Sequence, residues 1–189
     1  PALADFMGSF PAIDVEIVSD GLLSDIVADG FDAGIRLEEA VPQDMVALTL
    51  SAHEQIIVVG APDYLATRPA PVRPDDLRDH ECIVSRLPSG RPMAWEFEDG
   101  GRSFTIAVGG RLQVGSPAIA LQAAERGLGL AYVGMPDASK GLTSGALVQL
   151  LADWTPPFPG LRLYYPRQRH HSAAFQAFLN FLRERRVSI

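Results

Sequence analysis

The sequence has a single cysteine and no long uninterrupted apolar stretch. Cys82 is the only cysteine among 189 residues, so an internal disulfide and a site built from several thiolates are both excluded. Cys82 lies in the apolar stretch CIV, which favours a small buried thiol. No apolar run approaches the roughly 18 residues that a transmembrane helix requires, so we expect no membrane span.

Positive charge is also scarce. Lys140 is the only lysine, and the formal net charge at pH 7 is −7. Because a DNA duplex carries a dense row of phosphates, a chain with this charge balance is a poor direct DNA binder. The first residues include acidic Asp5 and no basic start of a signal peptide, so we expect a cytoplasmic location.

The remaining composition is that of a folded protein. Hydrophobic residues make up 47% and charged residues 21%, which allows a packed core and argues against disorder. The length suits one ordinary domain or two small lobes.

The first part of the chain alternates helices and strands. We predict a helix over 2–9, a strand over 14–18 (DVEIV), a helix over 21–29 and a buried strand over 33–37 (AGIRL). Ser19 and Asp20 are suited to cap the helix over 21–29, and glycine follows it. Such alternation predicts βαβ units and a parallel sheet.

The middle of the chain begins with its strongest strand, EQIIVVGAP at 54–62. Four prolines within 62–80 then mark a connector or a region of short helices. Further strands are expected over 82–86, 94–98 and 103–114, with a hairpin turn at the DGG of 99–101.

A clear helix follows, because Ser116 suits an N-cap and Pro117 suits the first helical turn. Gly127 ends this helix. The remaining expected elements are strands at 127–134, 146–151 and 161–166, a proline-rich break at 155–160, and a final helix from near Ser172 whose apolar face holds Phe175, Phe178, Leu179 and Leu182.

Two breaks followed by a short return segment predict an α/β fold of two Rossmann-like lobes with a cleft between them. We place lobe I at 1–60 and 162–189 and lobe II at 61–161. In such folds ligands bind at the carboxyl ends of strands and at helix N-termini.

Four stretches, in this order, resemble the effector-binding domain of LysR-type transcription regulators. They are FPAIDVEIVSDGLLSDIVADGFDAGIRLE at 10–38, VVGAPDYLATRPAPVRPDDLRDHECI at 58–83, RLQVGSPAIALQAAERGLGLAYV at 111–133, and LVQLLADWTPPFPGLRLYYPRQRHHSAAFQAFLNFLRER at 147–185. Each motif alone is modest, but four in the right order are specific.

The resemblance implies the type 2 periplasmic-binding-protein fold, with the family's first strand absent from this chain. It also implies a small-molecule effector, a carboxylate or aromatic acid, in the cleft between the lobes. A homodimer or tetramer is implied too, and DNA contact only through an N-terminal winged helix-turn-helix that this chain lacks. No cofactor and no metal is expected.

Candidate effector contacts lie where strands end and helices begin. Ser19 and Asp20 begin a helix whose free N–H groups suit a carboxylate, although they are also suited to be a simple cap. Arg36 ends a buried strand and can bind a carboxylate through two hydrogen bonds, or else form an ion pair with Glu38 or another acid.

The second lobe offers an equivalent place at Gly115, Ser116 and Pro117, where small residues leave a helix start open. Gly134 follows a strand end, in a Gly-Met-Pro sequence that departs from the family pattern. For a dimer interface the resemblance points to the outer faces of two helices, which carry Leu22, Leu23 and Ile26, and Ala118, Leu121 and Gln122.

Signals for an enzyme are weak. The four histidines lack ligand spacing to Glu or Cys, and His170-His171 are expected to lie on an exposed loop. Asp75-Asp76 are interpreted as a helix cap rather than a catalytic pair, and a G-x-S-x-G motif is absent. Two alternatives to a regulatory sensor stay open: a stand-alone solute-binding protein of the same fold and a two-lobed enzyme.

Overall fold

The computed structural model describes residues 2–18, 25–87, 89–167 and 171–185. The chain divides into two compact units, unit 1 (1–54 and 159–189) and unit 2 (55–158). The first division falls before the strand β4 (Ile56–Gly60), not after residue 60, because β4 pairs with strands of unit 2.

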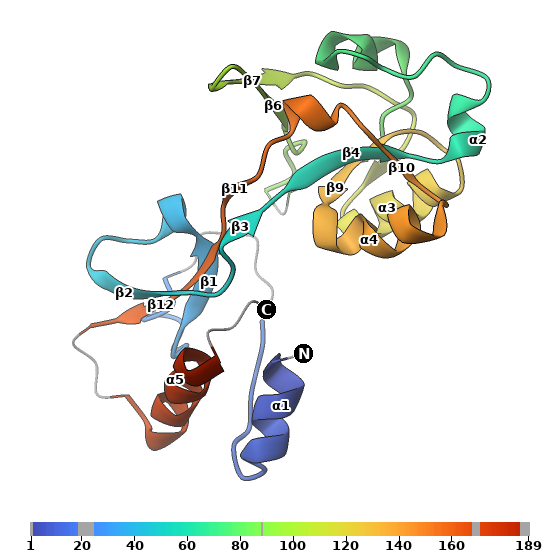
Figure 1. Ribbon diagram of the computed structural model, residues 1–189. Helices are drawn as coiled ribbons and strands as arrows, with labels where there is room; N and C mark the ends of the chain where they lie inside the picture. Colours follow the sequence, from blue (N-terminus) through green and yellow to red (C-terminus); the bar gives the residue numbers. More distant parts are fainter. Residues whose placement is uncertain (1, 19–24, 88, 168–170, 186–189) are drawn as a thin grey trace. The chain divides into compact units, whose positions relative to one another are not determined.

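Unit 1 is built on a three-stranded antiparallel sheet of β1 (Gly34–Leu37), β12 (Leu161–Pro166) and β2 (Met45–Thr49), with β12 in the centre. The helix α5 (Ala173–Arg185) packs against this sheet (Figure 1). The buried side chains between them are apolar or aromatic: Leu50, Leu163, Tyr165, Phe175, Leu179 and Leu182. The predicted strands over 33–37 and 161–166 and the final helix are therefore confirmed.

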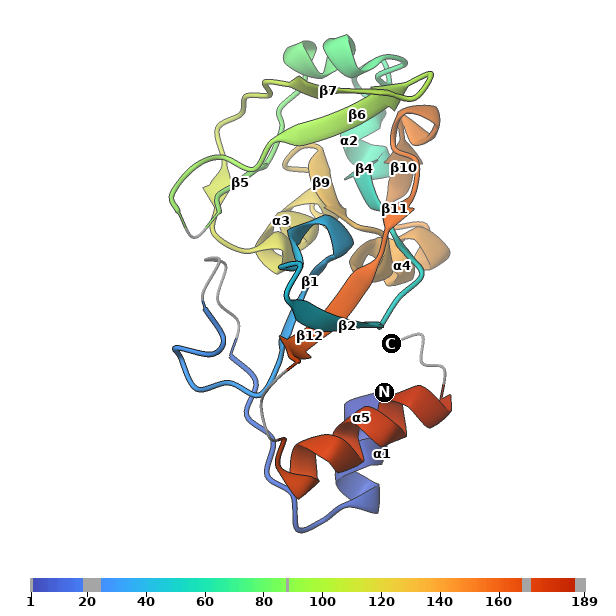
Figure 2. The same cartoon turned by 90° about the vertical axis from the view of Figure 1, so that its left-hand side faces the viewer.

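The predicted N-terminal helix is confirmed as α1 (Ala2–Ser9), which runs alongside α5 (Figure 2). Phe6 joins the two helices: its ring lies 4.9 Å from that of Phe178 and 5.3 Å from that of Phe181, both edge-on. Phe6 is almost fully buried, so this aromatic cluster holds α1 in place.

Two predictions for unit 1 are wrong. Residues 14–18 form no strand, and Ile17 is 71% exposed. The sheet is antiparallel because β1 pairs with β12, a strand from the far end of the chain, and not with residues 14–18. An alternating pattern makes a strand only where a partner strand satisfies its N–H and C=O groups.

The predicted helix over 21–29 falls partly outside the described residues, as do Ser19, Asp20, Leu22 and Leu23. Its described end is a hydrogen-bonded turn rather than an α-helix. Asp25 caps this turn, with its Oδ1 accepting the N–H groups of Val27 at 3.0 Å and Ala28 at 3.3 Å. Gly30 ends it with φ of +81°.

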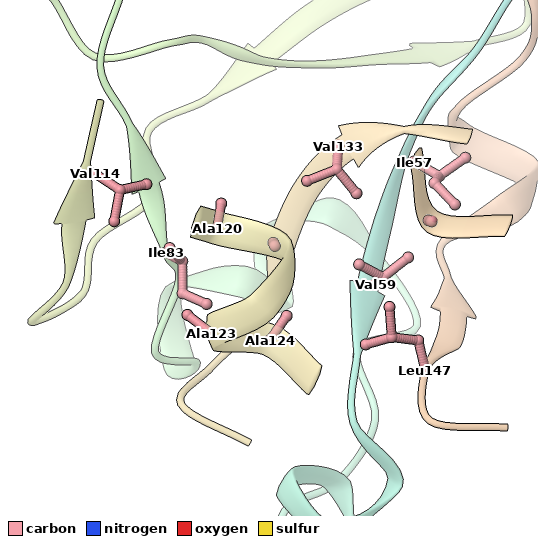
Figure 3. Packing of buried hydrophobic residues seen from close by; sticks show 11 residues of the cluster. Ile57, Val59, Ile83, Val114, Ala120, Ala123, Ala124, Val133 and Leu147 are labelled. Carbon is pink, nitrogen blue, oxygen red and sulfur yellow. The ribbon is translucent and has the colours of Figure 1, made fainter. Parts of the chain in front are cut away.

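Unit 2 contains a second antiparallel sheet in the order β10 (Val148–Leu150), β4, β9 (Ala131–Gly134). The helices α3 (Pro117–Glu125) and α4 (Met135–Ser144) pack on it. Small alanines at helical spacing let α3 approach closely, as Figure 3 shows. The core includes Ile57, Val59, Ile83, Val114, Ala120, Ala123, Ala124, Val133 and Leu147. The sequence predicted α3 but not α4.

The rest of unit 2 contains short pairs. β5 (Val84–Ser85) and β8 (Gln113–Val114) run parallel, while β6 (Trp95–Asp99) and β7 (Arg102–Ile106) form a hairpin. The hairpin is the one predicted at DGG: Gly100 and Gly101 have φ of 57° and 83°, as a two-residue turn of this hand requires. The predicted strand over 103–114 is thus two strands separated by coil.

The proline-rich segment after β4 holds the short helix α2 (Pro62–Leu65) and the 3-10 helix η2 (Pro74–Asp79). Two further 3-10 turns are η1 (Glu38–Ala40) and η3 (Ala152–Trp154). The chain passes from one unit to the other after the short strand β3 (His53–Glu54) and again within the short strand β11 (Phe158–Pro159).

Candidate functional site

The start of α3 is the most open of the predicted contact positions. The carbonyl of Ser116 accepts the N–H groups of Ile119 and Ala120, each at 3.1 Å, but its hydroxyl makes no capping hydrogen bond. A Cβ placed on Gly115 would meet nothing within 4 Å. Pro117 has no N–H and the N–H groups of Ile119 and Ala120 already donate to Ser116, so Ala118 supplies the remaining amide of the first turn. This amide lies at the positive end of the helix dipole, next to the uncrowded position of Gly115.

Gly134 lies at a comparable junction, where β9 ends and α4 begins. The N–H of Met135 donates to the carbonyl of Gln55 at 2.8 Å, which links the junction to the residue that precedes β4. A Cβ on Gly134 would come 3.2 Å from a carboxylate oxygen of Asp137. That carboxylate opposes an anionic ligand, so this junction suits an acid less well than the start of α3.

Arg36 lies in β1 with its guanidinium carbon 5.0 Å from the centre of the Tyr164 ring. Its neighbour across the sheet is Arg162, whose guanidinium pairs with Glu38 at 2.7 Å. The ion pair of Glu38 is therefore with Arg162. Stacking on a buried ring holds the Arg36 cation in a defined orientation.

The predicted dimer residues differ in accessibility. Ile26 is only 5% exposed, so its side chain does not lie on an accessible surface. On α3, Ala118 and Gln122 are exposed, whereas Leu121 is half-buried against the core. Sequence reasoning missed Ile119, which is 53% exposed; its place directly beside Ala118 on the outer face was the available signal.

The acidic pair at 75–76 is structural, as predicted. A carboxylate oxygen of Asp76 accepts the N–H groups of Val72 and Arg73, each at 2.9 Å, while Asp75 pairs with Arg78. These backbone hydrogen bonds lower the pKa of the Asp76 carboxyl. Among the described residues no group of three or more His, Cys, Asp or Glu side chains could hold a metal ion.

Cys82 is a buried thiol, as its apolar surroundings predicted. It is 1% exposed, and its sulfur donates weakly to the carbonyl of Leu77 at 3.6 Å. Burial raises the pKa of this thiol to about 12. A thiol in this state is a poor nucleophile.

Two cavities lie within single units. One, of about 170 Å³ in unit 2, is lined by Glu81, Cys82, Ile83, Arg111, Leu112 and Leu128. The other, of about 350 Å³ in unit 1, is lined by Val46, Tyr165, Arg167, His171, Gln176, Leu179, Asn180 and Arg183. Neither contains a predicted effector contact. The cleft expected between the lobes stays a prediction.

Among the described residues, no helix is both long and apolar enough to cross a membrane.

Comparison with known proteins places the chain in a family. The model of the LysR substrate binding domain family matches residues 1–186. A putative transcriptional regulator of Pseudomonas aeruginosa is 38% identical over 97% of this chain and 60% of its own length. Two proteins of Escherichia coli are each 35% identical to this chain: the uncharacterized HTH-type transcriptional regulator YcaN, over 96% of this chain, and the HTH-type transcriptional regulator PgrR, over 97%. The chain thus spans about three fifths of the length of these relatives.

Solved structures agree with the sequence comparison. The full-length Vibrio cholerae virulence activator AphB superposes with a TM-score of 0.82 at 23% identity, over 96% of this chain and 61% of that protein. The regulatory domain of CrgA from Neisseria meningitidis gives 0.78 at 23% identity, over 98% and 90%. These likenesses confirm the expected α/β fold of the type 2 periplasmic-binding-protein kind. The chain belongs to the LysR substrate-binding domain family.

Proposed function

We propose that this chain is the effector-sensing part of a transcription regulator and that its effector is a small carboxylate or aromatic acid. The observation that supports this most is the family match over residues 1–186, joined to relatives at 35–38% identity that are named as transcriptional regulators. Their names favour a regulator over a stand-alone solute-binding protein. They also favour a cytoplasmic place of action, with DNA bound by another region of the whole protein.

The start of α3 supports an anionic effector. Ser116 leaves its side chain out of the cap, and Gly115 keeps the approach open. Helix N-termini bind carboxylates through backbone N–H groups and the helix dipole. We assign Gly115, Ser116 and Pro117 to effector contact in unit 2, and Arg36 to contact in unit 1, where stacking on Tyr164 orients its guanidinium.

The two units are then the two lobes of the effector domain, and the chain acts by binding rather than catalysis. The outer face of α3, with Ala118, Ile119 and Gln122 exposed, is the described surface best suited to pairing two copies.

A thermal-shift screen of small carboxylates and aromatic acids tests the effector class. An effector at a hundredfold its Kd adds about 2.7 kcal/mol of stability. For a domain of this size that is a rise in Tm of about 5–10 °C. Turnover of any of these acids, on the other hand, would favour the enzyme alternative.

Two matched pairs of variants locate the contacts. Gly115→Asp places a carboxylate at the open start of α3 and should abolish the shift, whereas Gly109→Asp, also in open space, should keep it. Arg36→Gln should weaken binding, whereas Arg68→Gln should not. The Arg68 guanidinium also stacks on a tyrosine, 4.6 Å from the ring centre of Tyr64. The two variants therefore remove the same charge and the same kind of stacking, and differ only in the position of the arginine. Equal losses in both members of a pair would contradict the assignment.

The proposed pairing through α3 has its own test. Ile119→Glu puts a charge on the outer face without touching the buried alanines, so it should shift a dimer toward monomer in sedimentation experiments. An unchanged sedimentation profile would place the interface elsewhere.

A further inference from the structure

The cavity of unit 1 gathers positive charge in a chain whose net charge is −7. Two guanidinium groups, those of Arg167 and Arg183, and the imidazole of His171 line it, and none of its lining residues carries a carboxylate. Among the described carboxylates, none lies within ion-pair distance of either guanidinium. Two exposed guanidinium groups that line one cavity, with no carboxylate among its lining residues, suit the binding of an external anion.

The cavity is held by well-packed elements. Tyr165 comes from β12 and pairs across the sheet with Val46 of β2. Its ring lies edge-on to His171 at 5.1 Å and to Phe175 at 5.5 Å. Tyr165 is 5% exposed, so one wall of the cavity belongs to the core of unit 1.

Polar groups of α5 also line the cavity. Gln176, Asn180 and Arg183 follow at spacings of four and three, which puts them on one helix face. Arg183 Nη2 donates to the Tyr165 hydroxyl at 3.0 Å, which leaves the hydroxyl proton available to an anion. Gln176 Nε2 donates to the carbonyl of His171 at 3.3 Å, which holds the Gln176 side chain against the segment that precedes α5.

We propose that this cavity in unit 1 binds a small oxyanion with two negative charges, a phosphate or dicarboxylate group. Arginine guanidinium groups bind such oxygens through paired, charge-assisted hydrogen bonds, and the amide of Asn180 supplies a further donor. A volume of about 350 Å³ accommodates a group of this size. The site is separate from the proposed effector contacts, since neither Arg36 nor the start of α3 lines it.

An NMR titration of the ¹⁵N-labelled 189-residue chain tests the site. The probes are inorganic phosphate and malonate, each added in turn at pH 7.5, with sodium chloride at matched ionic strength as the reference. The side-chain amides of Gln176 and Asn180 are local reporters. We expect saturable shifts of these signals with at least one probe and none with chloride. A preference for phosphate points to a phosphorylated ligand, and a preference for malonate points to a dicarboxylate.

Substitutions then separate a built site from general charge screening. Arg167→Gln and Arg183→Gln should each weaken binding about tenfold or more. Arg126→Gln, which removes the same charge from the exposed end of α3, should leave binding unchanged. Arg167 makes no hydrogen bond with another described residue, so its variant stays informative even if loss of the Arg183–Tyr165 bond perturbs folding.

Two further variants complete the test. Asn180→Asp places a carboxylate in the cavity and should abolish binding, while Arg36→Gln should leave it intact because Arg36 belongs to the proposed effector site. Shifts that do not saturate, that chloride reproduces, or that survive in Arg167→Gln and Arg183→Gln at unchanged affinity would overturn the proposal. None of these outcomes depends on whether the acid effector is found.

Discussion

Gly34 is a position in unit 1 where one added methyl group should be costly. It pairs with Tyr164 across the sheet, and a Cβ there would lie 2.6 Å from three atoms of the Tyr164 side chain. Ordinary contacts of this kind are about 3.5–4 Å, so the side chain would have to move by about 1 Å. Tyr164 is 2% exposed and also supports the guanidinium of Arg36, so it has little room to do so.

The expected cost of Gly34→Ala follows from these distances. Overpacking a closed core costs about 1–3 kcal/mol. Replacing glycine by alanine returns about 0.5–1 kcal/mol through the unfolded chain. The clash wins, and we expect a net loss of about 1–2 kcal/mol. Gly8→Ala is the control in the same unit, because a Cβ on Gly8 meets nothing within 4 Å and lies in a helix, where alanine is favoured.

Urea unfolding followed by far-UV circular dichroism measures both variants. Fluorescence is less suitable, because Trp95 and Trp154 both lie in unit 2. A double-mutant cycle with Tyr164→Ala identifies the cause: without the ring, the cost of Gly34→Ala should shrink by about 1 kcal/mol or more. A neutral Gly34→Ala, or a cost that persists without the ring, would refute the steric explanation.

Three further predictions follow from burial and hydrogen bonding. Because the pKa of the Cys82 thiol is raised to about 12, about one thiol in ten thousand is ionised at pH 8, so a thiol-specific reagent should label Cys82 only after unfolding in urea. The carboxyl of Asp76 has a lowered pKa in the folded state, so it stabilises the fold above about pH 4, and this stabilisation is lost as the pH falls further. The difference in unfolding free energy between the wild type and Asp76→Asn, measured by urea titration, should therefore shrink on acidification. Phe6→Ala removes the buried ring between α1 and α5 and should cost about 3–5 kcal/mol by chemical denaturation, and a cost below about 1 kcal/mol would show that α1 is dispensable.

The elements that the sequence predicted correctly carry their own local signals. α3 begins at Pro117, α5 follows Ser172, whose hydroxyl oxygen accepts the N–H of Phe175 at 3.1 Å, and the hairpin turn needs two glycines of positive φ. Each signal acts within a few residues of the chain, so a linear pattern contains it.

The elements that were missed depend on distant partners. α4 contains Gly141, Thr143 and Ser144, which are poor helix formers. It is stabilised by packing: Ala138 is fully buried, and Gly141 lies so close to Leu147 that a Cβ would come within 2.7 Å of that side chain. The strand predicted over 14–18 failed for the opposite reason, since its alternation was good but no strand pairs with it in the described sheet.

The same distinction explains how much of the candidate sites was foreseeable. A helix start such as Ser116-Pro117 is defined by adjacent residues, so the sequence alone could suggest it as a candidate anion site. The cavity of unit 1 could not be found in that way, because Arg183 and Tyr165 meet only when α5 packs on β12. In the sequence, Gln176, Asn180 and Arg183 form a polar stripe opposite apolar residues, which is typical of a solvated helix face. Packing against Tyr165 converts part of that stripe into the wall of a cationic cavity, so it is the tertiary contact, and not the residue pattern, that makes this face a candidate for binding.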